Sequence, residues 1–243
     1  MTNELTDKVA LVTGGSRGIG YAIAEALLDE GAKVYICARD AASVKSAVAK
    51  LAGTGRSDRV DGAAADIRRY EDCRTIVARA AERFGGLDIL VNNAGIGIFK
   101  PVDQLTPADW AATIETNLSA VFYCSREAIP LMRRRGGGYI LNISSLAAVN
   151  TFPGGSAYNA SKFGLNGFTE AMMQDVRHDG IRVSTIMPGS VATDFGADPG
   201  ASPKEAWKLP PEDIAKAVVD LCRYPRGSLA SRIELRPSQP PRK

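Results

Sequence analysis

The chain has 243 residues, 45% of them hydrophobic and 23% charged, and a formal net charge of +3. A chain of this length can form one α/β domain, or two small ones, with a substantial core. The small net charge, without a stripe of Lys and Arg alternating with aromatic residues, argues against a nucleic-acid-binding protein. No apolar stretch reaches the length of a membrane span, and the polar N-terminus lacks the apolar core of a signal peptide. We therefore expect a cytoplasmic protein with no membrane partner.

Cysteine and histidine are too sparse for several kinds of site. The four cysteines are widely spaced and form no C-x-x-C pair: Cys37, Cys73, Cys124 and Cys222. This spacing indicates reduced, mostly buried thiols. His178 is the only histidine, which excludes a histidine-based metal cluster and a Ser-His-Asp triad. We expect no metal site.

Short apolar or β-branched runs alternate with longer helical patterns along the whole chain. The predicted strands span 8–13, 33–38, 59–65, 87–91, 138–144, 181–187 and 231–235. The predicted helices span 18–30, 41–52, 70–84, 107–135 (with a break), 157–179 and 211–222. This alternation predicts an α/β fold: a single doubly wound, Rossmann-like parallel sheet of about seven strands with helices on both faces. No repeat or linker divides the chain, so we expect residues 1–243 to form one dinucleotide-binding domain.

A glycine-rich turn follows the first predicted strand. Gly14, Gly18 and Gly20 stand between the apolar run 9–12 and the amphipathic run 21–28. In such a turn, backbone N–H groups can approach a pyrophosphate at the helix N-terminus. The spacing differs from the common G-x-G-x-x-G because the gap of three residues comes first. An ordinary tight turn is the alternative, but the strand before it and the helix after it favour nucleotide binding.

Tyr158 and Lys162 stand four residues apart in the predicted helix 157–179. At this spacing the two side chains share one face of the helix, about one turn apart. The ammonium would lower the pKa of the phenol from about 10, which would make Tyr158 a proton donor or acceptor useful near neutral pH. Such a pair also occurs by chance in many helices, so its meaning depends on the rest of the chain.

Together these two segments resemble the short-chain dehydrogenase/reductase family, in its single-domain branch. Further matches follow in order along the chain: Asp66-Ile67, Asn92 to Gly95, Asn117, Ser145, Pro188-Gly189 and Thr193. Ser145 stands thirteen residues before Tyr158, a separation similar to that of bacterial 3-oxoacyl-thioester reductases. The resemblance covers residues 6–195, and its specificity comes from the ordered set.

The end of the second predicted strand indicates which cofactor binds. In this fold a carboxylate there binds the ribose of NAD, whereas arginine accommodates the 2′-phosphate of NADP. By resemblance the NAD-selecting Asp would fall at Ala38, and Arg39 follows it directly. Arg17 is a second cation that could face the same phosphate, so we predict NADP. The alternative is that both arginines are solvated surface residues; Asp40, one residue further on, is expected to point away.

The resemblance implies a longer set of cofactor contacts. Asp66 would accept a hydrogen bond from the adenine amino group, and Ile67 would supply a backbone contact. Thr193 would bind the carboxamide, with backbone help from Val191. The other implied contacts are Gly14, Ser16, Gly18, Ile19, Gly20, Asn93, Ala94, Gly95, Tyr158, Lys162, Pro188 and Gly189.

The resemblance also implies a catalytic tetrad: Asn117, Ser145, Tyr158 and Lys162. Tyr158 would protonate the carbonyl oxygen during hydride delivery, and Ser145 would hydrogen-bond the same oxygen. Lys162 would bind the nicotinamide ribose and lower the pKa of Tyr158, while Asn117 would support a water that carries protons. Ser144 should face the opposite side of its strand. The structural alternatives are a helix cap for Asn117 and an ordinary strand-end serine for Ser145.

These roles predict an NADPH-dependent carbonyl reductase of small molecules, with 3-oxoacyl thioesters among the candidate substrates. An NAD(P)-dependent alcohol or polyol dehydrogenase is the first alternative, and an NADP-binding regulatory protein is the non-enzymatic one. We expect a substrate loop at about 194–210 and a flexible proline-rich tail at 236–243. Five apolar residues could line the pocket, although core or interface packing is an open alternative for each: Phe99, Leu146, Phe152, Phe195 and Trp207.

Relatives pair the helices equivalent to 117–135 and 157–179 across a two-fold axis. This chain carries apolar residues there beyond the needs of the sheet face: Val121, Phe122, Leu131, Phe163, Phe168, Met172 and Met173. We therefore expect a homotetramer, with a homodimer as the alternative because the tail after Arg236 could obstruct the second interface.

Overall fold

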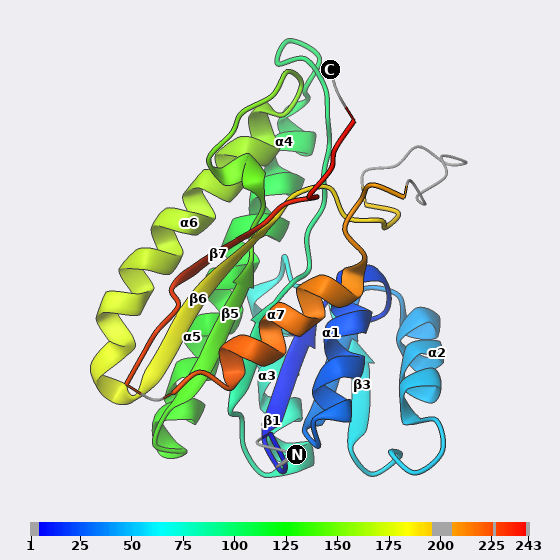
Figure 1. The fold of residues 1–243 in the computed structure, drawn as a ribbon, viewed down its shortest axis with the longest axis vertical. Coiled ribbons are helices and arrows are strands. Elements are labelled where there is room, and N and C mark those ends of the chain that lie inside the picture. The colour runs from blue at the N-terminus through cyan, green and yellow to red at the C-terminus, as the bar shows by residue number, and fades with distance from the viewer. Residues whose placement is uncertain (1–4, 196–205, 226, 242–243) are drawn as a thin grey trace.

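Seven parallel strands form the central sheet of the computed structural model, which describes residues 5–195, 206–225 and 227–241 (Figure 1). The strands are β1 (Val9–Thr13), β2 (Lys33–Ala38), β3 (Val60–Ala64), β4 (Ile89–Asn92), β5 (Gly138–Ile143), β6 (Ile181–Pro188) and β7 (Arg232–Leu235). Their order is β3-β2-β1-β4-β5-β6-β7, and each neighbouring pair is parallel. The predicted doubly wound, Rossmann-like sheet is confirmed.

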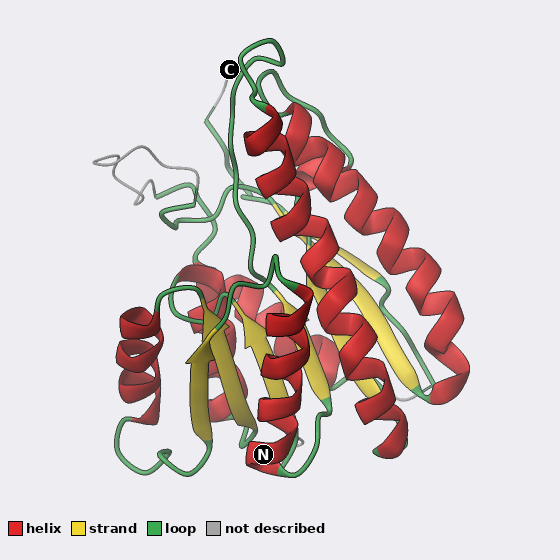
Figure 2. Cartoon of the chain, turned by 180° about the vertical axis from the view of Figure 1, so that it is seen from behind, coloured by secondary structure: helices red, strands yellow, loops and turns green. Residues whose placement is uncertain are grey.

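Helices cover both faces of this sheet (Figures 1 and 2). One face carries α1 (Gly18–Asp29), α2 (Ala41–Ala52) and α7 (Pro211–Cys222). The other face carries α3 (Tyr70–Phe84), α5 (Ala120–Arg134) and α6 (Ser156–Val176). The short helix α4 (Pro107–Ile114) packs beside α6. A capping box between Thr106 and Asp109 fixes where α4 begins.

Buried apolar side chains of the strands divide between two core layers. In β1, Ala10 and Val12 belong to the layer under α1, α2 and α7, whereas Val9 and Leu11 belong to the layer under α3, α5 and α6. Because helices cover both faces, the strand needs apolar residues on both sides, which explains its continuous apolar run.

Two predicted helices are divided in the structure. The predicted helix at 107–135 consists of α4, a π-helical segment η1 (Glu115–Ser119) and α5. The predicted helix at 157–179 consists of α6 and a short 3₁₀ turn η3 (Arg177–Asp179), after which Gly180 adopts a φ of 70°. The break in the first helix carries Asn117, so this irregularity belongs to the site described below.

The strand order changes direction between β1 and β4. In open parallel sheets ligands bind at this point, beyond the carboxyl ends of the strands. Within the described residues, no helix is long and apolar enough to cross a membrane, and no cluster of three potential metal ligands occurs. All four cysteines are free thiols. Residues 196–205 of the predicted substrate loop lie outside the described part of the chain.

Candidate active site

A cleft of about 2630 Å³ opens at the carboxyl ends of the strands. The loops that follow β1, β2, β3, β4, β5 and β6 all contribute to its walls. Every residue of the predicted site lines this cleft except Gly20 and Asn117. Those two lie against cleft residues, Gly20 beside Gly14 and Asn117 beside Gly95. The structure thus brings together residues that span most of the sequence.

The glycine-rich loop is fastened to the end of β4. Thr13 Oγ1 accepts hydrogen bonds from the backbone N–H groups of Asn93 (3.0 Å) and Ala94 (3.1 Å). Asn93 Nδ2 donates to the Thr13 carbonyl oxygen at 2.9 Å. A Cβ on Gly20 would lie 2.3 Å from the Gly14 carbonyl oxygen, so only glycine lets the loop fold this closely onto α1.

The first turn of α1 offers backbone donors for an anion. Arg17 at the N-cap makes no side-chain capping bond, and the first turn contains no acidic residue. Gly18 has a φ of 56°, and a Cβ there would lie only 3.4 Å from Thr193 Cγ2 on the opposite wall. The glycine backbone and Thr193 therefore approach each other closely at the N-terminus of α1, where backbone N–H groups can bind an anion.

The far end of the cleft carries the arginines that the sequence singled out. Arg17 and Arg39 are exposed and line the cleft. Asp40, in contrast, caps α2, because its Oδ1 accepts a hydrogen bond from the backbone N–H of Ser43 at 2.7 Å. The Asp40 carboxylate is thus bonded to the first turn of α2, which agrees with the expectation that it points away from a cofactor.

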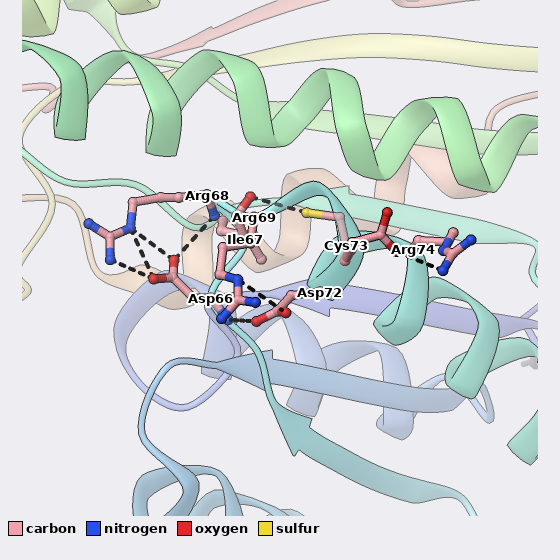
Figure 3. Close-up of polar contacts among 8 residues, drawn as sticks. Asp66, Ile67, Arg68, Arg69, Asp72, Cys73 and Arg74 are labelled. Atoms are coloured by element: carbon pink, nitrogen blue, oxygen red, sulfur yellow. Dashed lines mark hydrogen bonds and ion pairs between the residues drawn. The ribbon is translucent and has the colours of Figure 1, made fainter.

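Asp66 has a partner that sequence reasoning missed. Its carboxylate faces the guanidinium of Arg68 in a two-pronged ion pair, with Arg68 Nε 2.9 Å from Oδ1 and 3.1 Å from Oδ2 (Figure 3). These hydrogen bonds lower the pKa of Asp66, and the nearby charge of Arg39 acts in the same direction. Arg68 also lines the cleft, where its charge is balanced by that of Asp66. Asp66 and Arg68 lie in a loop, where side-chain directions follow no regular period. The sequence therefore gives no signal that these two residues pair.

The Tyr158 and Lys162 side chains are buried one turn apart on α6, only 8% and 4% exposed. Lys162 Nζ donates to the Ile143 carbonyl oxygen at 2.9 Å and lies 5.8 Å from the centre of the Tyr158 ring. Burial lowers the pKa of Lys162 to about 8. Burial also raises the pKa of Tyr158, against the opposing effect of a hydrogen bond with Ser145. The pKa of Tyr158 is thus raised by burial and not lowered as predicted, and Lys162 is not among the causes of the shift.

Ser145 sits where β5 has ended and a 3₁₀ turn η2 (Leu146–Ala148) begins. Its Oγ accepts a hydrogen bond from the backbone N–H of Ala147 at 3.1 Å, so the hydroxyl proton stays available for donation. Ser144 donates to Asn166 Oδ1 on α6 at 2.8 Å and lines the same cleft as Ser145. The expectation that Ser144 faces away from the site is therefore not confirmed.

Asn117 lies inside the π-helical segment, so it does not cap a helix. Its Oδ1 accepts from the backbone N–H of Ile96 at 2.8 Å, and its Nδ2 donates to the Ile96 carbonyl oxygen at 2.9 Å. Nδ2 also donates to Ser161 Oγ at 3.1 Å. Asn117 therefore ties the loop after β4 to α6, the helix that carries Tyr158.

A second asparagine, Asn159, positions the loop after β5. Its Nδ2 donates to the carbonyl oxygens of Ala147 (2.7 Å) and Asn150 (3.2 Å). The sequence places Asn159 beside Tyr158 but gives no sign of this clamp, because its partners are backbone atoms of a distant loop.

The family model described as short chain dehydrogenase matches residues 8–203. The chain belongs to the short-chain dehydrogenase/reductase family. The 3alpha-hydroxysteroid dehydrogenase of Mediterraneibacter gnavus is 34% identical over 242 residues, covering 93% of this chain and 96% of that protein. The predicted family is confirmed, whereas the narrower likeness to 3-oxoacyl-thioester reductases stays a prediction.

Solved structures of this short-chain dehydrogenase/reductase fold agree closely with the chain. A metagenomic short-chain oxidoreductase in complex with NADP has a TM-score of 0.84 at 34% identity, covering 97% of this chain and 99% of its own. An alcohol dehydrogenase from Thermococcus sibiricus, complexed with 5-hydroxy-NADP, has a TM-score of 0.88 at 30% identity with the same coverage. This short-chain dehydrogenase is an NAD(P)-dependent oxidoreductase that acts on CH–OH and C=O groups.

The lowered pKa of Lys162 predicts a pH dependence of stability. Because this pKa falls from 10.5 to about 8 on folding, the unfolded chain binds more protons between these values, and the contribution of Lys162 to stability rises with pH. Between pH 7.5 and 9.5, the unfolding free energy of the parent should gain about 2 kcal/mol relative to Lys162→Met. Urea denaturation at several pH values measures this. Lys216→Met, on the exposed face of α7, is the matched control and should show no such trend; a constant difference for Lys162→Met would contradict the shift.

Proposed function

We propose that this chain is an NADPH-dependent carbonyl reductase in which Tyr158 donates the proton to the carbonyl oxygen. The observation that carries this proposal is the buried Tyr158 phenol, which lines the same cleft as Ser145, Lys162 and the glycine-rich loop. When bound, the nicotinamide cofactor supplies the hydride. A buried donor next to a second hydroxyl can protonate and orient one carbonyl oxygen together.

Tyr158 is placed to act in either direction of the reaction. In reduction the phenol donates its proton to the carbonyl oxygen, and in oxidation the phenolate would act as base. We propose carbonyl reduction as the main activity, with an alcohol or polyol dehydrogenase as the alternative. Membership of a family of dehydrogenases argues against the non-enzymatic alternative, an NADP-binding regulatory protein.

Lys162, Asn117 and Gly95 support a supply of protons to the site. One Lys162 N–H is used by Ile143, which leaves the others for ribose hydroxyls or water. A Cβ on Gly95 would lie 3.3 Å from Asn117 Oδ1 and 3.9 Å from Lys162 Nζ, so the absence of that Cβ leaves both atoms facing one small space. We place a proton-carrying water there, held by the second lone pair of Asn117 Oδ1.

Two arginines support NADP over NAD. Arg17 and Arg39 line the cleft near Ala38, which offers no carboxylate to a ribose, whereas Arg68 is paired with Asp66. Two solved relatives carry NADP or a 5-hydroxy derivative of it. Because guanidinium groups bind phosphate in a two-pronged manner, this end suits a 2′-phosphate.

Tyr158→Phe should lower kcat for carbonyl reduction by about 10²–10⁴-fold while NADPH still binds, because the ring stays and only the proton donor is lost. Steady-state absorbance assays and fluorescence titration with NADPH measure the two quantities. Tyr224→Phe, an exposed tyrosine after α7, is the matched control. A Tyr158→Phe enzyme within about tenfold of the parent kcat would remove Tyr158 from the proposed role.

Arg39→Ala should reduce the ratio of kcat/KM for NADPH to that for NADH by about one to two decades, since a charge-assisted phosphate contact contributes about 1.5–3 kcal/mol. The loss should fall on the KM for NADPH. Arg74→Ala on the exposed surface of α3 should leave the ratio unchanged. A parent enzyme that uses both cofactors equally well would overturn the assignment.

We further propose that the helix layer of α4, α5 and α6 is an interface between copies of this chain. Two of the residues singled out in the sequence, Val121 and Met172, are buried in the subunit. Phe122 and Phe163 remain exposed, and Trp110 on α4 joins them. Apolar side chains of this size would be unusual on the surface of a monomer.

The proposed assembly is a homotetramer or, failing the second contact through β7, a homodimer. Multi-angle light scattering at micromolar concentration should give twice or four times the 25.8 kDa chain mass. Phe163→Glu should shift this mass toward the monomer, whereas Glu170→Gln, also exposed on α6, should not. A parent mass of one chain would exclude the interface.

A further inference from the structure

Three phenylalanine rings from three separate loops surround the Tyr158 phenol. Phe99 follows β4, Phe152 follows β5 and Phe195 follows β6. Their ring centres lie 5.5, 6.5 and 5.8 Å from the centre of the Tyr158 ring. Phe99 also meets Phe152, with 5.5 Å between centres and 64° between planes. The proposed proton donor thus stands beside an aromatic wall formed by Phe99, Phe152 and Phe195.

Glycines leave the space that these rings occupy. A Cβ on Gly97 would lie 2.6 Å from the Phe99 ring and 3.1 Å from the Phe195 ring. A Cβ on Gly155 would lie 2.7 Å from the Phe152 ring. A side chain at Gly97 or Gly155 would therefore displace the rings that form the wall.

One backbone hydrogen bond joins two of the loops that form the wall. The N–H of Lys100, next to Phe99, donates to the carbonyl oxygen of Gly154 at 2.9 Å. On the other side, Asn159 holds the loop that leads to Phe152 through the Asn150 carbonyl oxygen. Phe99 and Phe152 are consequently positioned relative to each other and to α6.

The wall leaves much of its apolar surface uncovered within the cleft. Phe99, Phe152 and Phe195 are 43%, 40% and 46% exposed, and all three line the cleft. Two cations of this region are paired, Lys100 with Asp109 at 2.7 Å and Arg236 with Glu234 at 2.7 Å. Asp194, directly before Phe195, also lines the cleft. An apolar ring would cover the exposed faces of the three phenylalanines.

We propose that the substrate is a ketone, or the matching secondary alcohol, that carries a planar apolar ring close to the reacting carbon. Aromatic rings prefer edge-to-face and offset arrangements with each other, so a phenyl or fused aromatic group gains more from this wall than a saturated ring of equal size. This inference rests on the proposed function and narrows its substrate.

Three ketones of equal carbonyl reactivity test the inference: 4-phenylbutan-2-one, 4-cyclohexylbutan-2-one and 4-hydroxybutan-2-one. In each, two methylene groups separate the carbonyl from the variable group. With NADPH, kcat/KM for the phenyl ketone should exceed that for the cyclohexyl ketone by at least ~3-fold and that for the hydroxy ketone by at least ~30-fold. Calorimetry should also show the phenyl ketone binding most tightly to the NADP-loaded protein.

Phe99→Leu and Phe152→Leu keep apolar volume but remove one ring each. Each should lower the phenyl-to-cyclohexyl ratio of kcat/KM, because each removes one of the rings that contact the aromatic group. Tyr224→Leu removes an aromatic ring of 45% exposure outside the cleft and should leave every ratio unchanged. Thermal unfolding of each variant verifies that it is folded, which partial exposure of the replaced rings favours.

The outcomes separate the two proposals. Reduction of all three ketones at similar efficiency would overturn the aromatic inference and leave the reductase standing. Tight binding of the phenyl ketone without reduction of any ketone would overturn the reductase and leave the aromatic site standing. Preference for the phenyl ketone that survives both leucine variants would overturn the assignment of Phe99 and Phe152.

Discussion

The hydrogen bonds between Thr13 and Asn93 join the ends of β1 and β4, the two strands between which the sheet reverses its order. Everything in the cleft depends on this joint, because it fixes the glycine-rich loop on one side and the loop toward Phe99 on the other. Thr13 uses its hydroxyl for two backbone N–H groups, and Asn93 returns a bond to the Thr13 carbonyl. The satisfied polar groups allow a loop with little side-chain packing to hold one conformation.

Burial is the second constraint on the site, and it acts oppositely on its two titratable groups. Desolvation favours the neutral form of each, so Lys162 loses affinity for its proton while Tyr158 retains its own. Burying Lys162 beside the Ile143 carbonyl costs desolvation free energy, which destabilises the folded chain. Such a cost is tolerable where a bound ligand later supplies hydrogen-bond partners for the ammonium.

The strands, the glycine-rich turn and the family could be predicted because they depend on local order: apolar runs, glycine spacing and motifs in sequence. The sign of the Tyr158 pKa could not, because helical spacing puts Lys162 nearby but says nothing about how deeply both are buried. The pair between Asp66 and Arg68 and the clamp of Asn117 on Ile96 depend on loop conformation, for which the sequence has no periodic signal. The sequence shows that Val121 and Met172 are apolar, but it does not show whether they face the sheet or a second subunit. The packing of the helices shows that both are buried within the subunit.

The position of Asn117 depends on the number of residues in the π-helical segment Glu115–Ser119. A π turn contains one residue more than an α-helical turn, and removing it would rotate all that precedes it by about 100° relative to α5. Asn117 would then lose its alignment with Ile96 and Ser161, although no side chain in the site had been replaced. A substitution on α4 or α5 leaves this alignment of Asn117 intact, whereas an insertion or deletion around Asn117 would break it. The segment between α4 and α5 is thus constrained in residue number more strictly than in residue type.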